Sequence, residues 1–296
     1  AKPKLFCLSL YASKTALTMN RNHSLAYVIA LCTHCQSVNS VLSSIPLGLT
    51  QGMDARRLFG TSGIRGIVNQ DLSPDFCRRV ASAIGTTLPP ASAVCIATDT
   101  RTSRDIIKDA ITAGLLACGI DVVDLGVLPT PALALLTRES GFTAGIMVTA
   151  SHNPPEFNGI KLFTKNSMGY SQAQEADIER VYFGQSFRDG TQGTLARAED
   201  MKERYLSFIK SKLPQPAFDH HLKVVVDPGN GAASKFASDI FVRMGFHVLP
   251  VNDEPDGLFP GRGPEPKADT LQGTVGFLRK HNADLAVCFD GDADRV

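Results

Sequence analysis

The sequence has no surplus of charge of either sign. Its 30 Lys and Arg residues meet 29 Asp and Glu residues, which leaves a formal net charge of +1 at pH 7. Such a balance offers no block of positive charge to neutralise phosphates, so it gives no reason to expect a nucleic-acid partner. The sequence also lacks a run of roughly 18 apolar residues, the length that a membrane-spanning helix needs. We therefore expect no nucleic-acid and no membrane partner, and the composition leaves the oligomeric state open.

Acidic residues are missing from the first 52 positions, which hold four basic residues and three of the seven cysteines. Serine-rich, acid-poor N-termini occur in transit peptides, and residues 24–32 resemble the apolar part of a secretion signal. We favour a simpler interpretation, in which Met53 is the true start and residues 1–53 are an upstream or disordered extension. The sequence begins with Ala and stops directly after an apolar run, so we expect it to be an excerpt of a longer protein.

One C-x-x-C motif is present, from Cys32 to Cys35. A zinc site needs four ligands and a redox motif needs a strand-to-helix context, and neither surrounds this pair. The remaining cysteines lie in apolar surroundings and are typical of small core residues: Cys77, Cys95, Cys118 and Cys288. This pattern fits a reducing compartment, and we expect a cytoplasmic protein.

From residue 54 onward, strand-like runs alternate with helical patterns of about 10–15 residues, which predicts α/β layers with ligand loops at the strand ends. The predicted strand-like runs are 94–97, 122–123, 126–128, 146–148, 160–163, 224–226, 247–251 and 285–289. The predicted helices are 103–117, 131–138, 171–182, 198–213, 232–244 and 267–280. A turn-rich stretch at 188–193 is the best boundary. We expect two successive α/β layered domains of similar architecture, 54–190 and 191–296, the second truncated.

A serine at a strand end carries the first candidate chemistry. The apolar run 146–148 leads into TASHNPP (residues 149–155), and a second strand-like run follows at once. A serine hydroxyl is a weak nucleophile unless a base or a modification activates it, and a lone Ser-His pair is more often a capped turn. Here two prolines stiffen the turn, Gly159 permits a close approach, and Lys161 returns on the next strand. We therefore favour a catalytic loop around Ser151.

Lys161 points to the strand face opposite Ile160 and Leu162, because side chains alternate along a strand. It therefore need not be buried with these two residues. A lysine near a serine can neutralise a phosphate or shuttle a proton. The alternative is a solvated strand residue.

A cluster of carboxylates follows the last apolar strand, in the string DGDADR (residues 290–295). Asp290, Asp292 and Asp294 form a compact set of oxygen ligands for a hard cation, and Mg²⁺ suits carboxylates combined with phosphate oxygens. Arg295 stands where an EF-hand requires Gly, so a calcium sensor is not indicated. The arginine suits a phosphate contact instead, and a solvated acidic turn is the alternative.

Two glycine-rich stretches remain. In FGTSGIRG (residues 59–66), small residues let backbone N–H groups approach an anion and Arg65 adds a fork of donors. A Gly-rich turn alone is weak evidence for a binding site. The stretch DPGNG (residues 227–231) lacks G-x-G-x-x-G spacing, and we interpret it as a tight strand-to-helix turn.

Together these motifs resemble the α-D-phosphohexomutase family, which includes phosphomannomutase/phosphoglucomutase and phosphoglucosamine mutase. FGTSGIRG is similar to the family's N-terminal loop, TASHNPPEFNGIK to its phosphoserine loop, and DGDADR to its metal loop. FPGRGPEPKADTL (residues 259–271) is similar to a further segment between them. Order and spacing agree over residues 54–296.

The resemblance implies that Ser151 is carried as phosphoserine and that Ser151, Asp290, Asp292 and Asp294 hold one Mg²⁺ ion. A phosphoryl group would pass between Ser151 and a hexose phosphate through a hexose bisphosphate. The resemblance assigns charge stabilisation to Arg65, Lys161 and Arg295, with Lys161 as the candidate for proton transfer. It assigns orientation of the loop to His152 and Asn153, and phosphate contacts to Thr61, Ser62, Gly63, Arg65 and Arg295.

The resemblance implies a protein of four domains and covers the first and most of the second, so we expect domains III and IV to be absent from this sequence. Positioning is most of phosphoryl-transfer catalysis, and we expect this chain alone to be inactive or nearly so. Sugar preference rests on the absent third domain. We favour phosphomannomutase/phosphoglucomutase, with phosphoglucosamine mutase as the alternative.

Two rivals of other classes remain. One is a catalytically inactive fragment that binds Mg²⁺ and a phosphosugar, against which the intact Ser151, Lys161 and aspartates argue. The other is a Mg²⁺-dependent phosphatase with an aspartate nucleophile, which would leave TASHNP unexplained. Replacing Ser151 with Ala separates a mutase from such a phosphatase.

Overall fold

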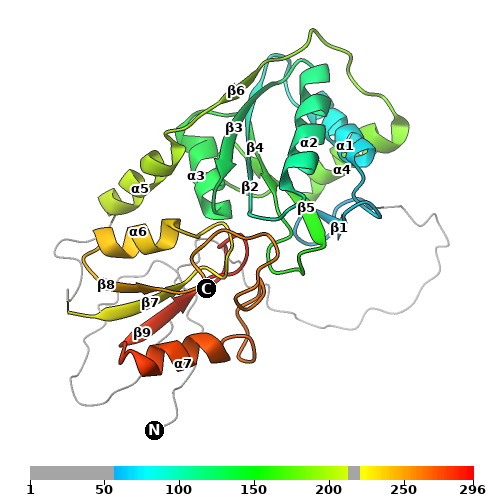
Figure 1. Ribbon diagram of the computed structural model, residues 1–296. Helices are drawn as coiled ribbons and strands as arrows, with labels where there is room; N and C mark the ends of the chain where they lie inside the picture. The colour runs from blue at the N-terminus through cyan, green and yellow to red at the C-terminus, as the bar shows by residue number, and fades with distance from the viewer. Residues whose placement is uncertain (1–56, 213–220) are drawn as a thin grey trace, which may run out of the picture.

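The computed structural model describes residues 57–212 and 221–296, and it folds into two α/β/α sandwiches (Figure 1). This confirms the predicted fold class of two successive α/β layered units. The interpretations of Met53, of the extension 1–53 and of the Cys32–Cys35 pair lie outside the described residues.

The first unit is built on a six-stranded sheet in the order β1-β5-β4-β2-β3-β6. Strands β2, β3, β4 and β6 are parallel, and β5 runs antiparallel to both β4 and β1. The strands are β1 (Ile64–Ile67), β2 (Ala93–Thr98), β3 (Asp121–Val127), β4 (Ala144–Val148), β5 (Phe157–Thr164) and β6 (Leu195–Arg197). Because β6 pairs with β3, this sheet continues past the turn-rich stretch at 188–193.

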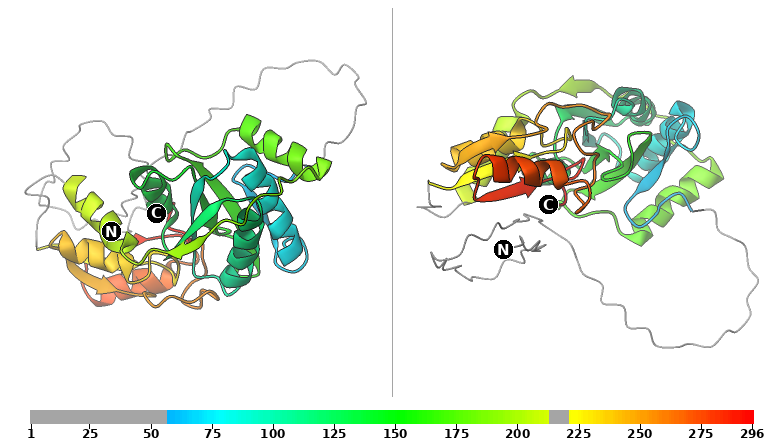
Figure 2. Two further views of the ribbon diagram at one scale, coloured as in Figure 1. Left: turned by 90° about the horizontal axis from the view of Figure 1, so that it is seen from above. Right: turned by 60° about the horizontal axis from the view of Figure 1, so that its bottom comes forward.

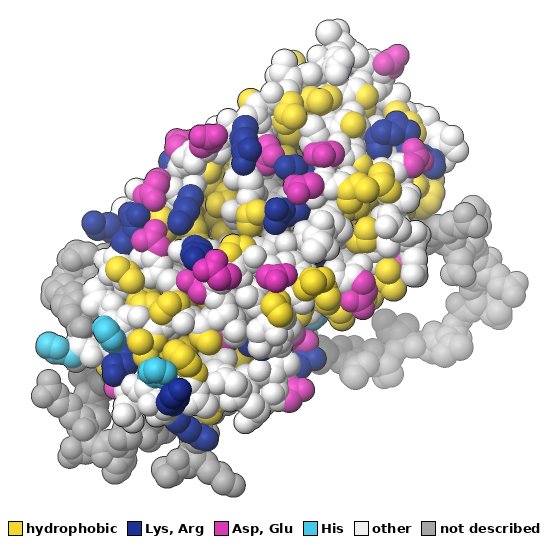
Figure 3. All heavy atoms as spheres, viewed as in Figure 1, with side chains coloured by type: hydrophobic (Ala, Val, Ile, Leu, Met, Phe, Trp, Pro, Cys, Tyr) yellow, Lys and Arg dark blue, Asp and Glu magenta, His cyan; other side chains and the backbone are white. Residues whose placement is uncertain are grey.

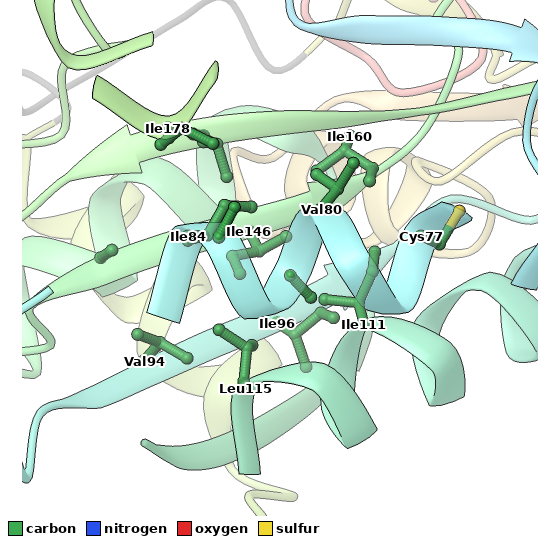
Figure 4. Packing of buried hydrophobic residues seen from close by; sticks show 14 of the residues in the cluster. Cys77, Val80, Ile84, Val94, Ile96, Ile111, Leu115, Ile146, Ile160 and Ile178 are labelled. Carbon is green, nitrogen blue, oxygen red and sulfur yellow. The ribbon is translucent and has the colours of Figure 1, made fainter. Parts of the chain in front are cut away.

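Helices cover both faces of this sheet. On one face lie α1 (Pro74–Thr87), α2 (Arg104–Ala117) and α4 (Gln172–Gly184), whose apolar side chains pack against alternate strand residues in the larger core cluster (Figure 4). On the other face lie α3 (Thr130–Glu139) and α5 (Met201–Lys212). The central strands β2 and β4 are therefore buried on both sides, and side-chain alternation sends successive residues to different cores.

Helix α1 and the short strands β1 and β6 were not among the predicted elements. The signals for α1 are nevertheless present: Ser73 caps its N-terminus by accepting a hydrogen bond from the Phe76 N–H, and Pro74 occupies the first turn. For β6 the sequence carries little signal, because its three residues are all exposed.

The second unit has a parallel three-stranded sheet in the order β8-β7-β9. Its strands are β7 (Lys223–Asp227), β8 (His247–Pro250) and β9 (Leu285–Cys288), and its helices are α6 (Phe236–Arg243) and α7 (Gln272–Lys280). The two helices pack on opposite faces, since the side chains of β7 alternate between two separate clusters.

Both helices of this unit begin later than predicted. Residues 232–235 form turns before α6, and Lys235 has a positive φ of 61°, which a helix does not allow. Before α7, the Thr270 hydroxyl donates to the Glu265 carbonyl and accepts from the Lys267 N–H. Such local side-chain bonds compete with helix formation, so α7 begins at Gln272.

The two units lie against each other in both views of Figure 2. Hydrogen bonds between loops at the carboxyl ends of their parallel strands join them. The Thr100 hydroxyl donates to the Asn230 carbonyl, and the Thr130 N–H donates to the Asp292 carbonyl. On the face drawn in Figure 3, acidic and basic side chains are interspersed. Among the described residues, no helix is long and apolar enough to cross a membrane.

Candidate active site

Ser151 lies at the boundary between the two units, on the loop that follows β4. Its side chain is buried, and its Oγ donates a hydrogen bond to Oδ2 of Asp290 over 2.7 Å. Its backbone has a φ of 55°, in the left-handed region that non-glycine residues rarely occupy. The serine thus faces the aspartate loop directly, from a strained backbone position of the kind often found at functional sites.

The strand pairing of the first sheet brings two side chains that were predicted to stabilise charge, Arg65 and Lys161, close to the Ser151 loop. Arg65 of β1 lies opposite Gly159 of β5, and its Nη1 donates to Oδ1 of Asn153 over 2.9 Å. A Cβ on Gly159 would lie 2.4 Å from the Ile64 carbonyl oxygen, so the predicted close approach at this glycine is confirmed.

Lys161 lies opposite Met147 on β4, and its neighbours Ile160 and Leu162 point into the core on the other face. Its ammonium donates to Oδ2 of Asp292 over 2.7 Å and to Oδ2 of Asp294 over 2.8 Å. Lys161 is a buried ion-pair partner, which contradicts the alternative of a solvated strand residue.

The three aspartates follow β9 and bring one carboxylate oxygen each to within 4.8 Å of one another. Oδ2 of Asp292 accepts from the Thr130 hydroxyl as well as from Lys161. Its Oδ1 is buried and has no hydrogen-bond partner among the described residues. A buried, unpaired carboxylate oxygen costs free energy unless something compensates it, and an oxygen donor set of this size fits a hard divalent cation.

Burial and charge shift the protonation of this cluster in opposite directions. Burial, together with the nearby charges of Asp292 and Asp294, raises the pKa of Asp290 well above its usual range. Burial alone would raise the pKa of Asp292 too, but the Lys161 ammonium outweighs it and lowers that pKa to about 2. Burial alone would lower the pKa of Lys161, but the two carboxylates raise it, so this lysine is an ammonium.

Two more buried polar atoms without a partner among the described residues lie beside Ser151: Nε of Arg65 and Nδ1 of His152. Burial and the charge of Arg295 lower the pKa of His152, so the imidazole is neutral at pH 7. Asn153 is positioned by Arg65, as described above, and the structure gives no corresponding contact for His152. Their predicted role in orienting the loop stays a prediction.

The glycine-rich stretch before β1 borders the same region. Thr61, Ser62, Gly63 and Arg65 help to line an open hollow of roughly 330 Å³. Gly63 has a φ of 85°, and a Cβ there would lie 2.3 Å from the Ile160 carbonyl oxygen, so only glycine fits against β5. The structure therefore brings these four predicted phosphate contacts to one hollow.

Arg295 stands at the edge of the cluster. Its side chain is 45% exposed, and its Nε lies 3.3 Å from Oδ2 of Asp290 and 3.8 Å from Oδ1 of Asp294. It is therefore available to an incoming anion, but its predicted phosphate contact is not shown by the structure.

Four polar residues at the site were not predicted. Thr130 contacts Asp292 from the start of α3, the Thr149 hydroxyl accepts from the Ser151 N–H, and Asp99 and Arg101 lie buried beneath the Ser151 loop. The available signal was their position, because all four lie within three residues of the end of a strand of the first sheet. The DPGNG turn, in contrast, has a structural role as predicted: Asp227 is buried and accepts from the N–H of Gly229.

Comparison with known proteins gives two family matches in chain order. Residues 56–189 match phosphoglucomutase/phosphomannomutase, alpha/beta/alpha domain I, and residues 203–296 match alpha/beta/alpha domain II of the same description. Each match contains one of the facing loops, the Ser151 loop in the first and the aspartate loop in the second.

Individual relatives agree with this. The chain is 40% identical over 248 residues to a protein of Methanobrevibacter smithii named "Probable phosphoglucosamine mutase", covering 82% of this chain and 55% of the relative. It is 39% identical over 247 residues to a phosphoglucomutase/phosphomannomutase of Thermococcus kodakarensis, covering 81% and 54%. The chain thus spans about half the length of the curated relatives it matches.

Two solved structures are similar to this chain in fold. A phosphoglucomutase/phosphomannomutase family protein of Burkholderia thailandensis superposes with a TM-score of 0.71 at 30% identity, over 79% of this chain and 52% of that one. The parafusin (phosphoglucomutase) of Paramecium, at 19% identity and a TM-score of 0.65 over 83% and 53%, shares the fold.

Proposed function

Because the chain belongs to the α-D-phosphohexomutase family, we propose that the whole protein interconverts hexose 1-phosphate and hexose 6-phosphate. Ser151 would carry the phosphoryl group as phosphoserine, and a bisphosphorylated hexose would be the intermediate. One observation carries the proposal: the Ser151 hydroxyl lies 2.7 Å from a carboxylate of the aspartate cluster, at the meeting point of the two units.

The aspartate cluster is the proposed Mg²⁺ site, formed by Asp290, Asp292 and Asp294 together with Ser151. The unpaired Oδ1 of Asp292 supports this assignment. A bound Mg²⁺ would draw negative charge from the transferring phosphoryl group. A phosphorylated Ser151 would add a charge of about −1.5 to −2 beside the carboxylates, which makes a cation there still more favourable.

In the proposed return step, in which the hexose bisphosphate gives a phosphoryl group back to Ser151, one proton leaves the serine and another is added to the sugar oxygen. As the phosphorus–oxygen ester bond of the hexose bisphosphate breaks and the Oγ–phosphorus bond of Ser151 forms, the hydroxyl proton leaves through its hydrogen bond to Oδ2 of Asp290. The departing sugar oxygen takes a proton from the Lys161 ammonium, which its bonds to Asp292 and Asp294 hold beside the cluster. Matched proton transfer of this kind is general acid–base catalysis.

Phosphate binding is proposed for the hollow before β1 and for Arg295. Thr61, Ser62 and Gly63 offer short side chains and accessible backbone, and Arg65 has a donor, Nε, without a partner among the described residues. Arginine is suited to such sites because its fork of N–H groups matches phosphate oxygens. Neutralising the charge of the sugar phosphate that is not transferred would hold that phosphate, and with it the substrate, in position.

The hexose itself is the open variable of the proposal. The relatives carry the names of both phosphoglucosamine mutases and phosphoglucomutase/phosphomannomutases. We take glucose and mannose phosphates as the first substrates to test and glucosamine phosphate as the alternative. A cytoplasmic location is proposed with it, supported by four described cysteines that are buried thiols.

The test is uptake of phosphate by Ser151. Because we expect this chain alone to be inactive or nearly so, the whole protein is incubated with glucose 1,6-bisphosphate and Mg²⁺. Mass spectrometry follows the peptide that contains Ser151. We expect one phosphate on Ser151, none in S151A, and normal uptake in S92A, a matched control at the opposite end of β2, where the Ser92 hydroxyl donates to the Pro89 carbonyl. Phosphate released at the same rate by S151A would contradict the proposal and favour an aspartate-based phosphatase.

A further inference from the structure

Arg101 is the largest fully buried polar side chain among the described residues, and the proposed reaction assigns it no part. We propose that Arg101, paired with Asp99, is a positioning residue that fixes the Ser151 loop for phosphoryl transfer. The inference rests on the proposed function for its catalytic consequence. The claim that Arg101 holds the Ser151 loop in place depends only on contacts within the chain, which can be tested without any substrate.

Every N–H group of the Arg101 guanidinium has its own acceptor. Nε donates to Oδ2 of Asp99 over 3.0 Å. Nη1 donates to two backbone carbonyls of the Ser151 loop, those of Pro154 and Phe157, and Nη2 donates to two more, those of Ser151 and Asn153. A guanidinium has five donors in a fixed plane, so all five are used. A lysine, with three donors and no plane, can replace at most part of this set.

Asp99 holds the other side of the same loop. Its Oδ2 accepts from the Thr149 hydroxyl over 2.7 Å, and that hydroxyl in turn accepts from the Ser151 N–H over 2.8 Å. Ser151 is therefore tied at its N–H through Thr149 to Asp99, and at its carbonyl to Arg101. One buried ion pair fixes both peptide groups that flank the serine.

This double attachment explains how Ser151 keeps a φ of 55°. A non-glycine residue holds the left-handed conformation only where its surroundings over-determine it. With the N–H and the carbonyl turned toward the Asp99–Arg101 pair, Oγ points to Asp290 on the other unit. The direction of the hydroxyl thus depends on the pair beneath the loop.

The second unit closes over the pair. The ring of Phe259 lies 5.2 Å from the Arg101 guanidinium carbon. A Cβ on Gly291 would lie 2.5 Å from the Ser151 carbonyl oxygen and 3.5 Å from the Phe259 ring. The loop that follows Asp290 therefore packs directly on the peptide group that Arg101 holds, which links the position of Ser151 to that of the aspartate loop.

Arg188 offers a matched control at the opposite end of the first sheet. Its guanidinium donates to three backbone carbonyls, those of Cys118, Leu88 and Gly85, and so joins the C-terminal ends of α1 and α2. Replacing it with lysine disturbs a partly buried set of backbone bonds of the same kind. None of these bonds involves the Ser151 loop or the aspartate loop.

The first experiment measures amide hydrogen exchange in the unliganded 296-residue chain, as wild type, R101K and R188K. We expect R101K to accelerate exchange at Ser151, Asn153 and Phe157 by at least about tenfold, because the bonds of these amides lie within the loop. Amides of α1 should stay protected. In R188K the acceleration should instead fall at the ends of α1 and α2. Unchanged exchange at Ser151 in R101K would overturn the proposal whatever the enzyme does.

The second experiment uses the whole protein and measures phosphate uptake by Ser151 from glucose 1,6-bisphosphate with Mg²⁺. We expect R101K to lower the maximal rate about 100-fold, the usual consequence of a small misplacement of a reacting group. The half-saturating bisphosphate concentration should stay nearly constant, and R188K should keep the wild-type rate even if its melting temperature falls. Equal losses of rate in R101K and R188K would reduce Arg101 to a general stabiliser and contradict the proposal.

The two experiments separate the inference from the function on which it rests. If the wild-type whole protein takes up no phosphate while R101K loosens the loop, the proposed function fails and the positioning role stands. If wild type takes up phosphate and R101K matches it, the function stands and the positioning role fails.

Discussion

Each unit of this protein has a buried aspartate–arginine pair at the end of a central strand, and the two pairs hold different loops. In the first unit Asp99 follows β2 and pairs with Arg101 over 3.0 Å. In the second unit Asp227 ends β7 and pairs with Arg262 over 2.9 Å. Both arginines also donate to carbonyls of a loop that follows a neighbouring strand, β4 in one unit and β9 in the other.

The pairs differ in how far their partners lie apart in the sequence. Arg101 is two residues from Asp99, and four of its five donors reach the Ser151 loop. Arg262 is 35 residues from Asp227, and of its hydrogen bonds one reaches the Phe289 carbonyl, directly before Asp290. The first pair is a local unit that organises one loop completely, whereas the second joins three segments and touches the metal loop at one point.

This comparison indicates that the two buried ion pairs fix the positions of the loops that they contact. A buried ion pair adds little net stability, because its desolvation offsets the attraction, but it fixes direction when each donor has one acceptor. The loops held in this way carry the serine and the aspartates of the proposed reaction. Three predictions would break or sharpen the comparison.

The largest effect is expected from removing the arginine of a pair. Arg101→Met leaves the Asp99 carboxylate buried without its cation, which typically costs about 3–5 kcal/mol of stability. Arg262→Met should cost less, because four of its hydrogen bonds are lost where Arg101 loses five. Urea unfolding measures both, and Arg78→Met, in an exposed pair with Asp75, is the control at about 1 kcal/mol or less. A larger loss for Arg262→Met would reverse the ranking of the pairs.

Magnesium should change the contribution of Asp290 to the free energy of unfolding but not that of Asp99. Burial raises the pKa of both Asp99 and Asp290 in the folded chain, so each carboxylate lowers stability as the pH rises through its folded pKa. A cation at the aspartate cluster offsets this for Asp290. We expect Mg²⁺ at 100 times its dissociation constant to add about 2.7 kcal/mol at pH 7. The gain should disappear as the pH falls through the raised pKa of Asp290.

Calorimetric melting with and without Mg²⁺ across pH checks this expectation, with Asp290→Asn as the control. That variant should lose most of the Mg²⁺ effect at every pH. A gain from Mg²⁺ that persists below the usual range of carboxylates, or that survives in Asp290→Asn, would place the cation elsewhere.

The smallest effect is expected in metal affinity, which should depend more on the Asp227–Arg262 pair than on the Asp99–Arg101 pair. Arg262→Lys should weaken Mn²⁺ binding about tenfold, in the range for residues that orient metal ligands. Arg101→Lys should change it less, because Arg101 holds the serine loop. Mn²⁺ titration followed by electron paramagnetic resonance measures both, with the exposed Arg243→Lys on α6 as control. Equal weakening by both variants would show that the two loops move as one.

The elements of this protein were predictable where burial follows a simple period. The helix expected at 103–117 is α2 (Arg104–Ala117), and the strand expected at 146–148 is the core of β4. Some errors fell where local bonds or short length overrule the period, as at the late start of α7 and at the exposed β6, whereas α1 was missed although its capping signals are present. The domain boundary expected at 188–193 stays a prediction. The first family match ends at residue 189 and the second begins at residue 203, while β6 between them pairs with β3.

The candidate site divides in the same way. The sequence by itself determined that Ser151 and Asp290 follow strands, because apolar runs end where polar residues begin, and it determined that both loops lie at the carboxyl ends of parallel strands. Only the tertiary structure decided that Lys161 forms a buried ion pair with residues 131 and 133 positions away and that Thr130 reaches Asp292 across 162 positions. Hydrophobic periodicity reports which face of an element is buried. Which charges share that burial depends on how the two sheets dock, and the weak screening of the interior then makes their pairing decisive.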